Sequence, residues 1–465
     1  MSHRIARSVL VAVALTACGP RPWWTASQVH PTHPGAAPYD SREIYRSMGY
    51  LVDTAQLRFV GSLRYLAAPT PDSTIVVFGL SLSNRALSFR TQGSDFVGRY
   101  HVDISFSGDS GYARDVSRDE TVKVHSVVET QRTDESIIYQ ENIPIRPGIY
   151  GVSVVVRDLQ SPAHGSHEIR DTVPRFDGPS LGTPIPIYQG HGRASLADFP
   201  DLVINPRGTV LTGPDSLHFY IEGYHLPPGT KLAAWVMDRD SVPFWQDTVT
   251  LEPRDRNGTL QTAKVAIGPG VLPLGSDVLW LSAIGSDSDI AVGYTPFLVS
   301  FSDRWAVASW DQMLSLFKFF DRQDLVTELR NASKADRIDA WRQFNRSSDT
   351  VPTTRQNEAL DGYLQRLETA NRRFQEFVDA GWLTDRGEVY ITLGEPDRAS
   401  EVPGKMGGAV KWEYDHPHVT LYFEDQSGLG QYKLTPESRE DYQTALNSLH
   451  RTSGATGSRE TGDGK

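Results

Sequence analysis

Residues 74–82 read TIVVFGLSL, and this stretch decides the fold class of the first half of the chain. Its apolar side chains alternate with period two, which is typical of a β-strand with one face on a core and the other in solvent. Residues 100–106 (YHVDISF) and 150–156 (YGVSVVV) carry the same pattern. Turn-forming clusters such as residues 107–111 (SGDSG) separate these runs. Many short strands divided by turns predict a β-sandwich over residues 41–160.

A second strand-rich block covers residues 201–302. Its clearest apolar runs are residues 216–222 (SLHFYIE), 231–237 (KLAAWVM) and 278–284 (VLWLSAI). We therefore expect a multidomain chain in which two immunoglobulin-like β-sandwich domains come first. Residues 161–200 are rich in Pro, Gly, Ser and His, so we predict a linker with irregular structure between them.

Beyond residue 302 the apolar period becomes helical. Ser309-Trp310-Asp311-Gln312 is a capping-box sequence and predicts the start of a helix. Two more short helices are expected around Leu325 and Trp341, followed by a long helix over residues 358–380. We expect residues 303–450 to form an α+β domain with helices packed on a small antiparallel sheet. The polar residues 451–465 are expected to be a disordered tail.

The segment after the long predicted helix, residues 381–397, reads GWLTDRGEVYITLGEPD. This segment resembles the signature of the GWxTD-domain family of exported bacterial proteins. The resemblance extends over about residues 349–434, including residues 412–414 (WEY) and 421–425 (LYFED). Members of that family typically combine this domain with β-domains, and the resemblance implies no particular catalytic activity. It marks a candidate functional motif made of Gly381, Trp382, Thr384, Asp385, Arg386, Gly387, Gly394, Pro396 and Asp397.

The motif also predicts a local conformation. Gly381 is expected to end the long helix with a left-handed backbone, and Gly387 to permit a tight reversal. Thr384 and Asp385 carry short oxygen-bearing side chains that accept hydrogen bonds from nearby amides. A strand is then predicted, with inward-facing side chains Val389, Ile391 and Leu393, ending at Gly394 with Pro396 in the turn. Residues 411–414, 419–423 and 431–434 are expected to complete an antiparallel meander, and Thr435-Pro436 to begin a last helix.

Four acidic residues of the motif region allow two interpretations. Asp385, Glu388, Glu395 and Asp397 could supply a pair of carboxylates for acid–base catalysis. Each also lies at a predicted turn or strand end, where acidic side chains commonly cap backbone amides. We favour the structural interpretation and expect Arg386 to pair with Glu388 or Asp397.

Other patterns are weaker signals of chemistry. Residues 108–111 (GDSG) are similar to a protease nucleophile loop but are better explained as a hairpin turn. His416 and His418 could share one strand face and bind a metal, yet Pro417 between them indicates a turn. The motifs of nucleotide-binding loops, hydrolase elbows and zinc proteases do not occur. The sequence predicts no catalytic residue, no metal site and no cofactor.

Length and charge narrow the function class. The chain has 465 residues, which corresponds to about three domains. It has 57 acidic residues against 46 Lys and Arg, for a net charge of −11. Because nucleic-acid binding depends on clustered basic side chains, this balance argues against a nucleic-acid partner.

The N-terminus predicts export and lipidation. Residues 1–17 combine early arginines with a short apolar run, which is typical of a signal peptide. Residues 15–18 (LTAC) resemble the lipobox of bacterial lipoproteins, with Cys18, the only cysteine, as the acylated residue. Residues 18–40, with five prolines, are expected to form an extended tether. Gly19 follows where an Asp would signal inner-membrane retention, so the outer membrane is the expected location.

These observations predict a lipid-anchored cell-envelope protein with a non-catalytic binding or scaffolding role. Its expected partners are the membrane, through the lipid anchor, and envelope proteins or glycan. The alternative is an envelope hydrolase, directed at glycan, that uses the carboxylates of the motif.

Overall fold

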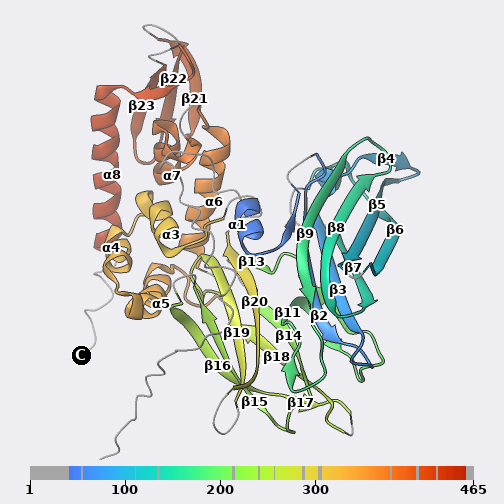
Figure 1. Cartoon of the computed structure of the whole chain (residues 1–465). Helices are drawn as coiled ribbons and strands as arrows, with labels where there is room; N and C mark the ends of the chain where they lie inside the picture. Colours follow the sequence, from blue (N-terminus) through green and yellow to red (C-terminus); the bar gives the residue numbers. More distant parts are fainter. Residues whose placement is uncertain are drawn as a thin grey trace, which may run out of the picture.

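The computed structural model describes residues 41–456 apart from short gaps. These gaps are residues 54–55, 110, 133–136, 212–214, 239–240, 256, 285–288, 302–305, 355–356, 377–379, 405–407 and 426–427. The predicted signal peptide, Cys18 and the tether lie outside the described residues, as do residues 457–465. The chain is multidomain, with β-sheets in its first two thirds and a helix-rich C-terminal part (Figure 1).

The first β-domain consists of two facing antiparallel sheets. One sheet has the order β1-β2-β3-β7, and the other has the order β4-β5-β8-β9 with β6 also paired to β5. The strands of the first are β1 (Leu51–Val52), β2 (Phe59–Ala67), β3 (Thr74–Leu82) and β7 (Ile137–Ile145). Those of the second are β4 (Phe89–Gln92), β5 (Asp95–Gly108), β6 (Ala113–Val124), β8 (Gly148–Asp158) and β9 (His164–Val173). One apolar cluster fills the space between the sheets, with Phe78 of β3 and Phe106 of β5 fully buried.

Strand β3, the TIVVFGLSL stretch, differs from the prediction in one respect. We expected one face in solvent, but every residue of β3 is buried. The second face, with Ile75 and Val77, packs against Ile185 and Ile204 of the next β-domain. A Cβ added at Gly79 would lie less than 3.0 Å from the Ile204 side chain. The near-continuous apolar run of β3 therefore results from burial on both faces.

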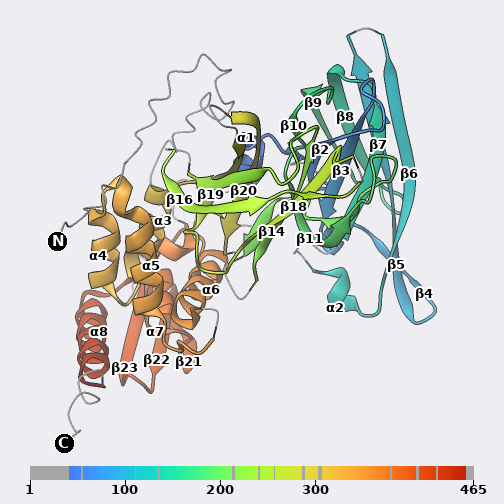
Figure 2. The same cartoon turned by 90° about the horizontal axis from the view of Figure 1, so that it is seen from below.

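The second β-domain also has two sheets. The first has the order β12-β11-β14-β18-β17 with β10 paired to β14, and the second has the order β13-β20-β19-β15-β16. Strands of the first are β10 (Ser180–Leu181), β11 (Ile185–Gly192), β12 (Asp201–Ile204), β14 (Leu217–Tyr224), β17 (Glu252–Pro253) and β18 (Leu260–Ile267). Those of the second are β13 (Thr209–Leu211), β15 (Lys231–Met237), β16 (Pro243–Thr250), β19 (Gly275–Ile284) and β20 (Asp289–Ser300). Figures 1 and 2 place this domain between the first β-domain and the C-terminal part.

The expected linker over residues 161–200 is not irregular. It contributes β9 to the first β-domain and β10 and β11 to the second. Strand β9 pairs with β8 from Gly148↔Val173 to Arg157↔His164. Its Gly, Ser and His content suggested a loop, but hydrogen bonding to a neighbouring strand outweighs that weak local preference.

Short helices connect the second β-domain to the C-terminal sheet. They are α3 (Trp310–Leu316), α4 (Gln323–Asn331), α5 (Arg337–Ser348) and α6 (Glu358–Arg373), with 3-10 turns at Phe317–Phe319 and Lys334–Asp336. The predicted capping box is confirmed, since the Ser309 side chain accepts a hydrogen bond from the Gln312 amide. Helix α6 ends at Arg373, earlier than the predicted 380.

Aromatic side chains join these helices into one core. The Phe344 ring stacks with Phe317 at 5.2 Å and with Trp341 at 5.6 Å between centroids. The same apolar cluster continues from Phe219 of the second β-domain to Phe423 of the C-terminal sheet. The helices therefore fill the space between two sheets rather than forming a separate bundle.

The predicted strand at residues 389–393 is wrong, because these residues belong to helix α7 (Asp385–Leu393). Their alternation suggested a strand, but Val389, Tyr390 and Ile391 are all buried, as in a helix covered on several sides. A 3-10 turn, η5 (Gly381–Leu383), precedes α7.

The C-terminal antiparallel sheet has the order β21-β22-β23-β24. Its strands are β21 (Arg398–Pro403), β22 (Gly408–Tyr414), β23 (Val419–Asp425) and β24 (Tyr432–Leu434). The predicted meander is thus confirmed, with β21 in place of the expected first strand.

The last helix, α8 (Pro436–Thr456), begins where Thr435-Pro436 predicted. It continues into the expected disordered tail, as far as Thr456. The described residues also form two minor helices, α1 (Ser41–Ser47) and α2 (Val127–Thr130), and a 3-10 turn at Asn84–Ala86. Helix α1 lies beside the second β-domain, where the Tyr45 and Thr209 hydroxyls are 2.7 Å apart.

Candidate functional site

The two leading glycines of the motif bring backbone segments into contact. A Cβ added at Gly381 would lie 2.6 Å from the Ala370 carbonyl oxygen and 2.5 Å from that of Asn371, at the end of α6. A Cβ at Gly387 would lie less than 3.0 Å from the Gly381 carbonyl oxygen. Gly381 is therefore needed for close approach, and it begins η5 rather than capping the long helix in a left-handed conformation as predicted.

Thr384 and Trp382 fix the start of α7. The Thr384 hydroxyl accepts a hydrogen bond from the Gly387 amide at 3.0 Å and donates one to the Gly381 carbonyl at 2.8 Å. This is the N-cap arrangement, which satisfies an otherwise unpaired helix amide. Trp382 is buried, with its ring 6.4 Å from that of Phe319 in an edge-on contact. The motif therefore locks α6, η5 and α7 together.

Asp385 and Glu388 both bind Arg439 of α8. The Asp385 carboxylate accepts a hydrogen bond from the Leu434 amide at 2.7 Å and lies 2.7 Å from the Arg439 guanidinium. Glu388 lies 3.1 Å from the same guanidinium. Burial alone would lower the pKa of Arg439, but the two carboxylates raise it above its usual value. These acids thus attach α7 to β24 and α8.

Glu395 and Asp397 are engaged at the other end of α7. Gly394 ends the helix with a φ of +86°, as its place in the predicted turn with Pro396 requires. Glu395 forms a bidentate ion pair with Arg373, and this pairing lowers the pKa of Glu395. The Asp397 carboxylate accepts a hydrogen bond from the Asp415 amide at 2.6 Å.

Arg386 does not pair with Glu388 or Asp397, which corrects our prediction. Its guanidinium lies over the Tyr432 ring, 4.1 Å from the centroid, and 3.4 Å from Glu376. Glu376 in turn accepts a hydrogen bond from the Tyr432 amide at 3.1 Å. Arg386 therefore packs between a helix end and the sheet, and its side chain is only 18% exposed.

We call residues 381–397 with these contacts the GWxTD clasp. The four carboxylates of the clasp bind four different partners, which are Arg439, the Leu434 amide, Arg373 and the Asp415 amide. A pair for acid–base catalysis needs two carboxylates facing one reacting bond in different environments. The side chains instead connect secondary-structure elements, which is the structural interpretation.

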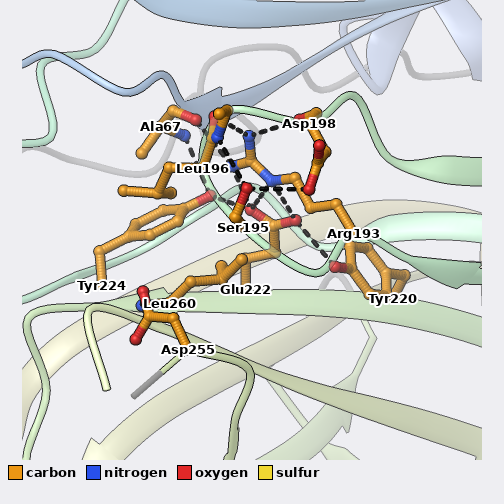
Figure 3. A network of polar contacts seen from close by, with 11 residues as sticks. Ala67, Arg193, Ser195, Leu196, Asp198, Tyr220, Glu222, Tyr224, Asp255 and Leu260 are labelled. Carbon is orange, nitrogen blue, oxygen red and sulfur yellow. Dashed lines mark hydrogen bonds and ion pairs between the residues drawn. The ribbon is translucent and has the colours of Figure 1, made fainter. Parts of the chain in front are cut away.

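A second polar cluster, missed in the sequence, lies at the joint between the two β-domains (Figure 3). Arg193 of the loop after β11 and Glu222 of β14 form an ion pair at 2.7 Å, with both side chains fully buried. The Tyr220 and Tyr224 hydroxyls donate to the same carboxylate at 2.8 and 2.6 Å. Burial, together with that carboxylate, raises the pKa of both tyrosines, so they remain protonated donors.

Arg193 also reaches the first β-domain. Its guanidinium donates to the Ala67 carbonyl of β2 at 2.7 Å, while the Ala67 amide donates to the Tyr224 hydroxyl at 3.0 Å. We call Arg193, Glu222, Tyr220, Tyr224 and Ala67 the polar joint. The sequence does carry one signal of this cluster. Glu222 lies between Tyr220 and Tyr224 at a spacing of two residues, in a strand that is otherwise mostly apolar.

A third polar cluster lies on the outer face of the first β-domain. His101 Nδ1 is 2.5 Å from Asp119 and Nε2 is 2.9 Å from Asp103, which also accepts a hydrogen bond from Ser117. The hydrogen bonds to Asp119 and Asp103 raise the pKa of His101. Burial alone would raise the pKa of Asp103, but hydrogen bonds from Ser117, Arg157 and His101 lower it to about 2. This ring is an ion-pair partner rather than a general base, because both its nitrogens face carboxylates.

The weaker sequence candidates are placed in turns. Gly108 and Gly111 lie in the β5–β6 hairpin, where the Gly108 amide donates to the Tyr112 carbonyl. His416 and His418 lie in the turn between β22 and β23 rather than on one strand. Within the described ranges, no group of three or more His, Cys, Asp and Glu side chains could hold a metal ion.

The helices of that same part of the chain are too short or too polar to cross a membrane.

Residues 286–448 match the family model described as the GWxTD domain. The chain contains a GWxTD domain. The matched region includes β20, so the GWxTD domain begins within the sheet of the second β-domain and continues through α3–α8 and the C-terminal sheet. No curated protein matches the chain at a significant level.

Solved structures give only remote similarity. A red sea bream transglutaminase is 10% identical with a TM-score of 0.17, over 56% of this chain and 33% of that one. A trypsin-activated α2-macroglobulin from Escherichia coli is 13% identical with a TM-score of 0.19, over 55% of this chain and 18% of that one. The chain thus spans a third or less of the length of these two proteins. TM-scores this low support no inference about fold details or activity.

Proposed function

We propose that this chain is a lipid-anchored cell-envelope protein with a non-catalytic binding or scaffolding role. The observation that carries the proposal is that every carboxylate of the GWxTD clasp holds a backbone amide or an arginine. Side chains engaged in this way stabilise a fold and are not poised to exchange protons with a substrate.

The packing between domains supports a scaffold. The polar joint fixes the first β-domain on the second, and one apolar cluster runs from the second β-domain into the GWxTD domain. Large, buried contacts of this kind oppose domain motion. We further propose that both β-domains are immunoglobulin-like, a type of sandwich that often serves as a rigid binding module in exported proteins.

The anchor in this proposal is the acylated Cys18. A single acyl chain binds a membrane reversibly, whereas two or three chains hold a protein there stably. Residues 18–40 would then extend the folded part away from the outer membrane, toward envelope proteins or glycan.

The hydrolase alternative receives less support from the geometry. It requires two clasp carboxylates to converge, one with a raised pKa, but Glu395 has a lowered one. Asp385 and Glu388 converge on a guanidinium rather than on open space.

Cell fractionation and cross-linking test the proposal. The full chain should sediment with membranes and carry a diacylglyceryl group detectable by mass spectrometry, while Cys18→Ser should be soluble and unmodified. In-cell cross-linking should recover the same envelope partner from the wild type and from Asp385→Asn. A wild-type chain recovered soluble and without lipid would contradict the anchor. Absence of any specific cross-linked partner would contradict the binding role.

A further inference from the structure

A hollow of about 590 Å³ lies on the outer face of the second β-domain, on the sheet that also carries the polar joint. Its walls include Tyr188, Gln189, His191, Asp201, His218 and Lys264. They come from β11, β12, β14 and β18, so the hollow is built on strands rather than on loops. Its volume falls in the range of small-molecule sites, which is roughly 300–1,000 Å³.

Two irregularities in strand β11 coincide with this hollow. The pairing of β11 with β12 shifts register between Ile187 and Gln189 and again between Gly190 and Gly192. Such bulges bend a strand and redirect its side chains, and they are frequent beside functional sites. The sequence is suited to this conformation, since Gly190 has a φ of +132° and Gly192 a φ of +78°.

Close packing makes both glycines necessary. A Cβ at Gly190 would lie 2.7 Å from the Leu202 Cα, and one at Gly192 would meet the Tyr220 ring at less than 3.0 Å. The Gly190 carbonyl also accepts a hydrogen bond from the Lys264 ammonium at 2.5 Å. This exposed contact places the Lys264 side chain against the bulge of β11.

The chemistry of the lining favours a neutral, hydroxyl-rich ligand. Lys264 and Asp201 contribute one positive and one negative charge, so the lining attracts no strongly charged ligand. Gln189 and two histidines add groups that can both donate and accept hydrogen bonds. Tyr188, 46% exposed, provides an aromatic ring beside these polar groups. An aromatic ring with mixed donors and acceptors complements a pyranose, which has apolar C–H faces and peripheral hydroxyls.

We propose that this hollow is a saccharide-binding site for a neutral pyranose glycan, in which Tyr188 packs on a sugar ring while Asp201 and Gln189 bind hydroxyls. This inference rests on the proposed binding function and names the class of its partner. It places that partner next to the polar joint, so the joint holds the site in a fixed position relative to the first β-domain.

Retention on immobilised glycans tests the site. The full chain in detergent is passed over the neutral glycans cellulose, chitin, xylan and mannan, with polygalacturonate as the acidic comparison. The wild type should be retained by at least one neutral glycan, and the matching soluble oligosaccharide should elute it. Tyr188→Ala and Asp201→Asn should each weaken the affinity about tenfold or more, measured by calorimetry with that oligosaccharide.

Tyr422→Ala is the matched control, because Tyr422 is 40% exposed on a strand of the GWxTD domain far from this site in sequence. It should bind as the wild type does, and all variants should show the wild-type melting temperature. Retention by none of the neutral glycans, retention by polygalacturonate alone, or equal affinity of the Tyr188 and Tyr422 variants would overturn the proposal. If cross-linking still recovers an envelope partner in that case, the proposed function stands and only the saccharide site is lost.

Discussion

The polar joint and the GWxTD clasp both connect distant elements through ion pairs, but they differ in how much water reaches them. Arg193 and Glu222 of the joint are fully buried, whereas Asp385 and Arg439 of the clasp are 15% and 36% exposed. Taking a charge out of water is costly unless it keeps its partner, and removing one partner leaves that cost uncompensated. Removing a single charge should therefore lower the free energy of unfolding most in the polar joint.

In the clasp, stability should depend mainly on close packing between backbone segments. Its ion pairs with Arg439 and Arg373 lie where solvent still screens them. Gly381 and Gly387, in contrast, meet backbone atoms that cannot move aside. The two connections therefore depend on different kinds of interaction, a desolvated charge pair in the polar joint and a steric fit in the clasp.

Breaking the joint should have the largest effect. Arg193→Met leaves the Glu222 carboxylate buried without a cation, and we expect a loss of about 3–5 kcal/mol in the free energy of unfolding, measured by urea titration. Arg193→Met combined with Glu222→Gln should regain part of that loss, because the unpaired charge is gone while an amide oxygen still accepts the hydrogen bonds of Tyr220 and Tyr224. Arg170→Met, which removes a highly exposed ion pair with Asp109, should change stability by less than about 1 kcal/mol. Equal effects of the two single substitutions would remove the distinction between joint and surface.

Adding a methyl group inside the clasp should cause the second-largest loss of stability. Gly387→Ala places a Cβ against the Gly381 carbonyl, so α7 must shift, at a cost of about 1–3 kcal/mol. The matched control is Gly362→Ala in helix α6, where an added Cβ meets nothing within 4 Å. That change should stabilise the protein by about 0.5–1 kcal/mol, because alanine favours helix. Thermal unfolding compares the two, and a stabilising Gly387→Ala would refute the steric account.

Removing a charge from the clasp should lower the free energy of unfolding less than Arg193→Met or Gly387→Ala does. Asp385→Asn keeps an acceptor for the Leu434 amide but weakens the contact with Arg439, so we expect a loss of about 1 kcal/mol in unfolding free energy. Glu401→Gln, on the exposed part of β21, is the control and should have no measurable effect. A loss as large as that of Arg193→Met would mean that the clasp behaves like the buried joint.

The smallest effect concerns an exposed cluster. Asp119 and Asp103 raise the pKa of His101, so its contribution to stability is fully present below the unfolded pKa of about 6.5. That contribution is lost as the pH rises through the higher folded pKa. Nuclear magnetic resonance titration should find the His101 pKa above 6.5, and His101→Gln should flatten the dependence of stability on pH in this range. A His101 pKa below 6.5 would contradict the ion-pair geometry.

The sequence predicted features that depend on neighbours along the chain. The Ser309 capping box, the start of α8 at Pro436 and the strands of the C-terminal meander all follow from local patterns. The family match of residues 286–448 likewise confirms the resemblance drawn from residues 381–397.

Features that depend on distant contacts were missed. Residues 389–393 alternate as a strand would, and only the packing of α7 against other elements reveals a helix. Arg193 lies in a segment that looked like a linker, and its partner Glu222 belongs to another strand. Arg386 had nearer carboxylates in sequence, but its partners in space are Tyr432 and Glu376. Pairings of this kind are set by tertiary structure and leave little trace in a local pattern.

The proposed scaffold requires that the two β-domains and the GWxTD domain form one rigid body. Because Cys18 is the only cysteine, spin labels can be placed at Thr121→Cys on β6 and Glu440→Cys on α8 in a Cys18→Ser background. Pulsed electron resonance should then give a single narrow distance distribution between the labels. A broad distribution, or several separate distances, would contradict the claim.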